Sequence, residues 1–243
     1  MKSCLSISLL FIGVSITIAA PADDHGVNIK PAKDHIDFLI GKDLVARYHV
    51  GADVAKPYFW PLNGPGGVPL TRAWPMEKAQ PGETTDHVHQ KSAWFCHGDV
   101  IPEGIELKDK IKGVKGVDFW SEAPGHGVIA CIDIGEAKTG KDHAWITTKN
   151  EWTTADKVKI LDDPSNPYPA CWHSRGYGLH AANPFGRTGS GFPAMADKTD
   201  LVKLAKGDHL KLRYGILLHA EDAKNGRVEE AFEKFVKLGK PSK

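Results

Sequence analysis

The chain has 243 residues, and its 31 lysines and arginines nearly balance its 30 aspartates and glutamates. Because the positive charges are scattered, the composition argues against a protein that binds nucleic acid or an anionic membrane surface. After the N-terminal segment, charges, glycines or prolines interrupt every apolar run within about ten residues, so no membrane span is predicted there. A small molecule or an oligosaccharide is the partner that this composition favours.

The first 22 residues have the order of a secretory signal peptide. Lys2 precedes an uncharged apolar run over 5–19, and small residues permit cleavage after Ala19 or after Ala22. The run is shorter than the roughly 20 apolar residues that span a bilayer, which favours cleavage over anchoring. We therefore expect export to the periplasm or the extracellular space.

About 220 residues remain after cleavage, which is enough for one domain with its own core. Residues 23–35 are polar, and we expect a flexible lead-in there, before a single domain over 36–243. The cysteines that remain are Cys96, Cys131 and Cys171. An oxidising compartment permits one disulfide among them and leaves one thiol.

Short segments rich in β-branched and aromatic residues recur between turn-forming residues along the chain. They predict strands over 44–50, 57–62, 92–100, 116–122, 125–135, 143–152 and 209–220. One helix is predicted over 227–238, because Val228, Ala231, Phe232, Phe235 and Val236 form an apolar stripe that we expect to pack in the core. The pattern favours an all-β fold: an antiparallel β-sandwich or supersandwich with one C-terminal amphipathic helix.

Two histidines lie two residues apart, at His87 and His89, directly after Asp86. In an extended segment their imidazoles point to the same face, where they can ligate one metal ion or act as acid and base on one substrate. His97 can complete a three-histidine site for a divalent metal such as copper, iron or zinc. Ordinary hydrogen-bonded or surface histidines are the alternative interpretation.

Asp118, Trp120 and Glu122 alternate along the sequence, so in a strand they share a face. An indole beside two carboxylates is the combination that a sugar-processing site needs, with the ring as platform and the acids for proton transfer. Trp94 is a second candidate platform. A structural tryptophan among solvated acids is the alternative.

The stretch 162–186 places several chemically versatile side chains between turn residues. We predict that Trp172 stacks on a ligand, His173 acts as acid or base, Arg175 clamps a carboxylate or hydroxyls, and Asn183 contributes to binding. Alternatively, Arg175 and Asn183 tie the loop to its own carbonyl groups.

Four segments together look like signature blocks of one family: KPYFWPLNGPGGVPLTR, TDHVHQKSAWFCHGDV, VDFWSE and DDPSNPYPACWHSRGYGLHAANPFG. They resemble the PmoA-like family of secreted proteins, often labelled methane oxygenase PmoA and found in planctomycetes and related bacteria. The resemblance implies a β-sandwich whose blocks converge on one site. Carried onto this sequence, that site comprises Asp86, His87, His89, Asp118, Trp120, Trp172, His173 and Arg175.

The sequence departs from the family pattern in two places. Members usually have a further block of strands between the segment 150–152 and the segment 162–167, and Asp163 stands where a histidine is expected. The resemblance therefore identifies this chain as a shortened relative. Family members often lie beside genes for sugar dehydrogenases, which implies carbohydrate substrates.

Three functional hypotheses follow. The first is a carbohydrate-active enzyme that acts on glycan fragments or oxidised sugars by acid–base chemistry, with catalytic residues His87, His89, Asp118, Glu122, His173 and Arg175 and substrate-binding residues Trp94, Trp120, Trp172 and Asn183. The second is a metal-dependent oxygenase that uses His87, His89 and His97. The third is a sugar-binding or inactive truncated relative.

Overall fold

A computed structural model describes residues 26–98, 100–102, 104–141, 143–161, 171–174, 180–183, 215–219 and 221–238. In 171–174 and 180–183 only the backbone is described. The predicted signal peptide and Arg175 lie outside these residues.

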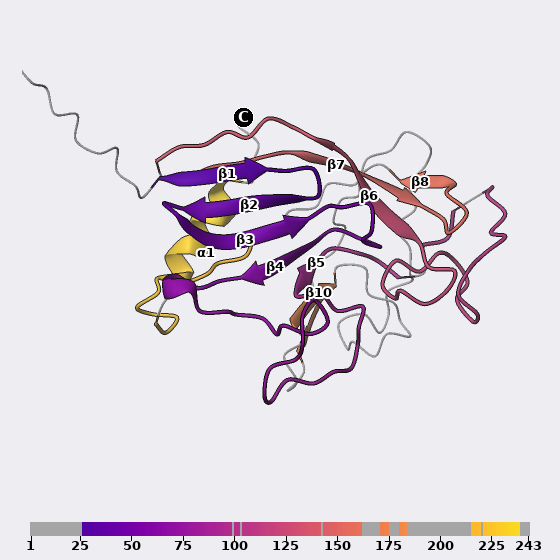
Figure 1. Cartoon of the computed structure of the whole chain (residues 1–243), viewed down its shortest axis with the longest axis horizontal. Helices are drawn as coiled ribbons and strands as arrows, with labels where there is room; N and C mark the ends of the chain where they lie inside the picture. The colour runs from indigo at the N-terminus through magenta and orange to yellow at the C-terminus, as the bar shows by residue number, and fades with distance from the viewer. Residues whose placement is uncertain are drawn as a thin grey trace, which may run out of the picture.

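The N-terminal half forms a five-stranded antiparallel sheet whose strands follow one another in chain order (Figure 1). The strands are β1 (Val27–Pro31), β2 (His35–Ile40), β3 (Asp43–His49), β4 (Tyr58–Leu62) and β5 (Ala93–Trp94), with a short 3₁₀ helix η1 (Pro65–Gly67) after β4. A tight turn joins β2 to β3, and Gly41 there has a φ of 59°, a backbone conformation that favours glycine.

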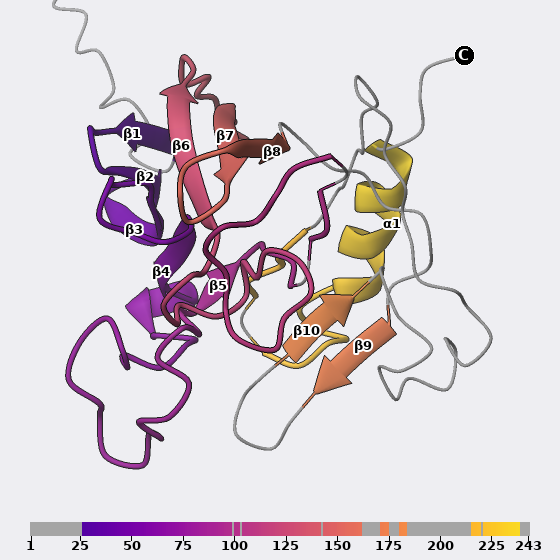
Figure 2. The same ribbon diagram turned by 90° about the vertical axis from the view of Figure 1, so that its right-hand side faces the viewer.

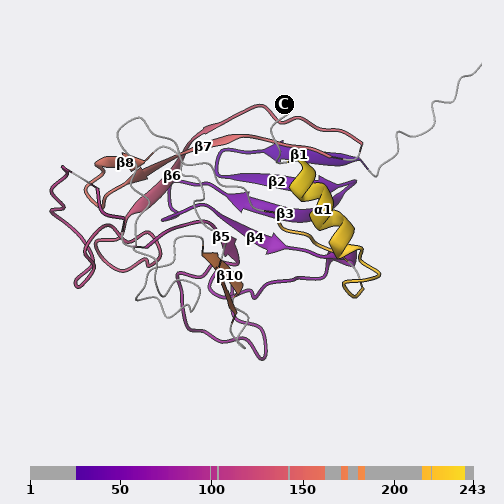
Figure 3. The same ribbon diagram turned by 180° about the vertical axis from the view of Figure 1, so that it is seen from behind.

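A second antiparallel sheet, a strand pair and one helix complete the described chain. The sheet contains β6 (Val128–Ile134), β7 (Thr148–Thr153) and β8 (Lys159–Leu161), the pair is β9 (Cys171–Ser174) with β10 (His180–Asn183), and the helix is α1 (Val228–Leu238). Seen from the side and from behind, α1 lies behind the five-stranded sheet (Figures 2 and 3).

One face of the five-stranded sheet is apolar and faces the second sheet. Ile36, Tyr48 and Phe59 stand directly opposite one another on β2, β3 and β4. Ile36 is fully buried, and the Tyr48 and Phe59 rings stack 4.4 Å apart. Burial raises the pKa of Tyr48 to about 12, and the Thr148 side chain on β7, which lies near its hydroxyl, offsets part of this rise. The two sheets therefore pack with a sandwich-like core between them.

A second apolar cluster lies between β6, β7 and the long connection that precedes them. Val117, Phe119, Ile129 and Trp152 are each at most 3 % exposed, and the rings of Phe119 and Trp152 are 4.6 Å apart. A side chain at Gly127 would approach the Phe119 ring to 2.4 Å, so only glycine fits there. This cluster anchors the connection that contains Trp120 and Glu122.

The all-β class and the C-terminal helix are confirmed, but several boundaries differ from the predictions. Residues 27–31, expected in the flexible lead-in, form β1 and pair along their whole length with β2. Residues 116–122 form no strand, because the Asp118 carboxylate accepts the N–H groups of Trp120 and Ser121 that a strand would need. Residues 215–219 form no strand either, and the rest of the strand predicted over 209–220 lies outside the described residues.

The apolar stripe of α1 is only partly packed. Phe235 is half-buried and contacts Gly215, whereas Phe232 is 64 % exposed and Val236 is 43 % exposed. The periodicity that predicts a buried stripe is present, but α1 has no partner for all of it among the described residues. Cys96 and Cys131 are free thiols. No helix in the described part of the chain has the length and apolarity needed to cross a membrane.

Candidate functional site

A carboxylate held by two ammonium groups forms the centre of the candidate site. The Glu122 carboxylate accepts hydrogen bonds from Lys91 Nζ at 2.8 and 3.0 Å and from Lys56 Nζ at 3.2 Å. Lys56 also donates to the Trp120 carbonyl at 3.1 Å. The Lys56 side chain is only 3 % exposed, whereas the side chains of Lys91 and Glu122 are 21 % and 20 % exposed. A buried ammonium thus fixes the carboxylate that faces the outside.

Three separate stretches of chain supply this centre. Lys56 lies just before β4, in a segment fixed to β6 because the Ile129 amide donates to the Ala55 carbonyl. Lys91 lies two residues before β5, and its ammonium sits 5.6 Å from the Tyr58 ring centroid. Glu122 follows the turn that Asp118 organises. Their convergence depends on tertiary structure alone.

Aromatic rings border the charged centre. The rings of Trp94 and Trp120 are 5.6 Å apart and tilted by 57°, and the His89 ring lies 6.1 Å from that of Trp120. All three side chains are partly exposed. We call the set Lys56, Lys91, Glu122, Trp94, Trp120 and His89 the Trp120 site.

His89 is the side chain in the Trp120 site that is best placed to exchange a proton. Its Nε2 atom is buried and has no hydrogen-bond partner among the described residues. Burial, followed by the charges of Lys56 and His87, lowers the pKa of His89 below its ordinary value of 6.5. The imidazole is therefore neutral at pH 7.

The neighbouring His87 is held by a different network. Its Nδ1 lies 2.7 Å from the Asp86 carboxylate, and Arg72 binds both Asp86 at 3.1 Å and the His87 carbonyl at 3.2 Å. Hydrogen bonds from Thr84 and Arg72 lower the pKa of Asp86 to about 2. His87 has a φ of 46°, so a turn rather than a strand brings the two imidazoles to 5.8 Å.

The two predicted carboxylates have unequal roles. Asp118 accepts the Trp120 amide at 2.7 Å and thereby shapes the turn that presents the indole. Burial alone would raise the pKa of Glu122, but the hydrogen bonds and charges of Lys91 and Lys56 outweigh it and lower that pKa. Glu122 is therefore ionised near neutral pH and is a poor proton donor.

The third predicted metal ligand, His97, makes a hydrogen bond to the Gly98 carbonyl through Nδ1. No group of three His, Cys, Asp or Glu side chains that could hold a metal is found among the residues that the structure describes. The proposed set of His87, His89 and His97 remains a prediction. Cys96 next to it is inert, because burial raises the pKa of its thiol to about 12.

The later predicted residues are placed only in part. The backbones of Trp172 and His173 on β9 pair with those of Ala182 and Ala181 on β10, and Asn183 pairs with Cys171. Their side chains, and Arg175, lie outside what the structure describes. Their participation in the Trp120 site therefore stays a prediction.

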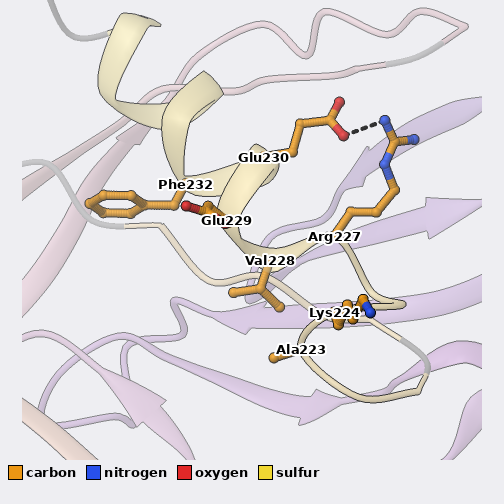
Figure 4. Close-up of a pocket in the computed structure, with 7 residues that line it drawn as sticks. All are labelled: Ala223, Lys224, Arg227, Val228, Glu229, Glu230 and Phe232. Atoms are coloured by element: carbon orange, nitrogen blue, oxygen red, sulfur yellow. Dashed lines mark ion pairs between the residues drawn. The ribbon is translucent and has the colours of Figure 1, made fainter.

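A hollow of about 680 Å³ lies elsewhere, at the start of α1 (Figure 4). Its lining includes an ion pair between Arg227 and Glu230 and the exposed ring of Phe232. None of its described lining residues belongs to the Trp120 site, and none is a histidine or tryptophan. We therefore place the candidate chemistry at the Trp120 site.

Sequence reasoning missed Lys56, Lys91 and Tyr58. Single lysines carry no local signal, since most lysines in a sequence are solvated surface residues. Tyr58 is placed inside a predicted strand, where an aromatic residue is ordinarily interpreted as core. Among the lysines whose side chains the structure describes, Lys56 stands out by its burial, at 3 % exposure.

Comparison with known proteins gives one match. The model of a family of unknown function, DUF6807, matches residues 35–161 and 157–233. No curated protein and no solved structure is significantly similar to the chain. Because the two matched segments cover well over half of its residues, the chain belongs to the DUF6807 family of unknown function.

Proposed function

We propose that this chain is an exported protein that binds a carbohydrate at the Trp120 site and acts on it by proton transfer through His89. One observation carries the proposal: a buried imidazole nitrogen without a partner among the described residues lies beside two partly exposed indoles and a lysine–glutamate pair. Functional groups of this kind gather where a polar ligand completes their hydrogen bonds.

The chemistry of the site suits a sugar. The apolar C–H face of a pyranose matches an indole surface, and Trp94 and Trp120 offer two such surfaces at an angle. Sugar hydroxyls both donate and accept hydrogen bonds. The Lys91 ammonium supplies donors, and the Glu122 carboxylate supplies acceptors, at positions fixed by the buried Lys56.

Proton transfer is assigned to an imidazole rather than to a pair of carboxylic acids. The usual glycosidase mechanism needs one protonated carboxyl group. Here Glu122 is held ionised by two lysines and Asp118 is used by a turn. His89 is neutral at pH 7 and can accept a proton from a sugar hydroxyl or from a carbon next to a sugar carbonyl.

The resemblance to the PmoA-like family supports carbohydrate as the ligand class and export as the location. It also supports our proposal that the chain lacks a middle block. The family match comes in two segments that meet at 157–161, which is close to the point where the block is expected. We propose that the shortened chain keeps the Trp120 site, because residues 56–122 supply all of its members.

Two substitutions test the proposal against a panel of plant and algal oligosaccharides and their keto derivatives. Trp120→Ala should abolish binding measured by calorimetry, since it removes the platform. His89→Gln should leave binding within a few-fold and abolish product formation. If wild-type protein neither binds nor converts any compound of the panel, the proposal is wrong.

A second candidate is a sugar-binding protein without catalysis. It is favoured by the fact that two lysines hold Glu122 ionised and that the Asp118 carboxylate accepts a backbone N–H group of its own turn. It predicts binding that depends on Trp120, no product under any condition, and equal behaviour of wild-type protein and His89→Gln.

A further inference from the structure

A row of polar and aromatic side chains runs from the Trp120 site across the outer face of the five-stranded sheet. His35, His49, Tyr58 and Trp94 stand directly opposite one another on β2, β3, β4 and β5. Residues opposite each other on neighbouring antiparallel strands share a face. The row therefore connects Trp94 on β5, a member of the Trp120 site, with His35 on β2.

Two side chains in the middle of the row are in direct contact. The rings of His49 and Tyr58 stack 4.6 Å apart at 11°, and the Lys91 ammonium lies 5.6 Å from the Tyr58 ring centroid. Tyr58 is 9 % exposed, so its ring is buried between His49 and the Trp120 site and is not available to stack on a ligand. The His49 Nε2 atom is fixed by the Trp60 carbonyl at 2.7 Å.

Beyond Tyr58 lies a second group with sugar-binding chemistry. Arg47 and Asp37 are opposite each other on β3 and β2 and form a two-pronged ion pair at 2.6 and 2.9 Å. Arg47 remains 35 % exposed. It uses two of its five N–H groups on Asp37, which leaves donors directed away from the pair. The Trp60 ring lies 6.5 Å from that of His49 and supplies an aromatic surface.

We propose that this group is a second subsite, so that the ligand of the Trp120 site is a neutral oligosaccharide lying across strands β5 to β2. The inference rests on the proposed function. Three strand spacings of about 4.8 Å give a path of about 14 Å, which is longer than one pyranose ring.

The charges of this path favour a neutral glycan over an acidic one. Arg47 is paired with Asp37, and the two lysines of the Trp120 site hold Glu122, with Asp118 close by. Positive charge is thus matched by carboxylates along the path. An acidic glycan needs a surplus of positive charge to offset its desolvation, and the path provides none.

The test is the dependence of affinity on chain length. Calorimetric titrations use neutral gluco-, manno- and galacto-oligosaccharides of one to six units, and uronate oligomers of the same lengths. For wild-type protein we expect at least a tenfold rise in affinity between the monosaccharide and the trisaccharide of the preferred series. Uronate oligomers should bind more weakly than the neutral series.

The variant Asp37→Asn/Arg47→Gln keeps the shape of the pair and removes its charges together. It should bind the monosaccharide as wild-type protein does and lose the rise with chain length, while Trp120→Ala should lose binding at every length. Glu136→Gln, in an exposed pair, is the matched control and should change nothing. Urea midpoints confirm that each variant is folded.

The outcomes separate this inference from the proposed function. Affinity for neutral sugars that does not depend on length overturns the second subsite and leaves the Trp120 site in place. Tighter binding of uronates overturns the charge argument. Absence of binding by any sugar overturns the proposed function and this inference with it.

Discussion

Replacing Glu122 with glutamine should destabilise the protein more than replacing its buried partner Lys56 with methionine. The substitution keeps the size of the side chain and removes the negative charge next to Lys56, whose side chain is 3 % exposed. Lys56 would keep only charge-neutral acceptors, the Trp120 carbonyl at 3.1 Å and the amide oxygen that replaces the carboxylate. A buried ammonium would then lack a countercharge.

The expected magnitude follows from burial. Breaking a buried ion pair by removing one partner costs about 3–5 kcal/mol, and the partial exposure of Glu122 reduces this to about 2–3 kcal/mol. Lys56→Met removes the buried charge instead and leaves Glu122 paired with Lys91 at 2.8 and 3.0 Å. It should cost only about 1 kcal/mol, the effect of leaving the Trp120 carbonyl without its donor.

Urea unfolding followed by tryptophan fluorescence measures both free energies, provided that the transition is two-state. For a domain of this size the loss in Glu122→Gln corresponds to a Tm lower by about 4–12 °C. Glu136→Gln, in an exposed pair with Lys138, is the control and should change stability by less than about 1 kcal/mol. The reasoning is refuted if Glu122→Gln costs no more than this control, or if Lys56→Met costs as much as Glu122→Gln.

Three further predictions concern stability and reactivity. Burial lowers the pKa of His49 and of His89 below 6.5, so both histidines bind protons more readily in the unfolded protein. Their contribution to the free energy of unfolding should be complete above pH 6.5 and should be lost as the pH drops through the lowered pKa values. Urea titrations from pH 8 to 5 should show this loss, and a loss of equal size in His49→Gln/His89→Gln would contradict it. Cys96 should resist alkylation at pH 8 until the protein unfolds, as peptide mass spectrometry can show, because burial raises its pKa to about 12. Phe235→Ala should cost about 2–3 kcal/mol and Phe232→Ala less than about 1 kcal/mol, since only Phe235 is packed; equal losses in urea unfolding would show that α1 packs differently.

The sequence by itself determined the properties that local patterns encode. Short runs of β-branched and aromatic residues between turn-forming residues predicted β3, β4 and β6, and the apolar period over 227–238 predicted α1. The spacing of His87, His89, Trp94, Trp120 and Glu122 identified five residues that meet or border one site. These residue types stand out because tryptophans, histidines and closely spaced acids are informative even without a structure.

Tertiary structure decided how those residues are used. The alternation at 118–122 predicted a strand, but Asp118 binds its own turn instead, two lysines lower the pKa of Glu122, and the Nε2 atom of His89 is buried without a partner among the described residues. Lys56 and Lys91 approach Glu122 from segments 66 and 31 residues away. Register alone sets His35, His49, Tyr58 and Trp94 in one row. Burial and strand register depend on contacts between distant segments, and for that reason no local pattern could show which charge is buried or which rings are neighbours.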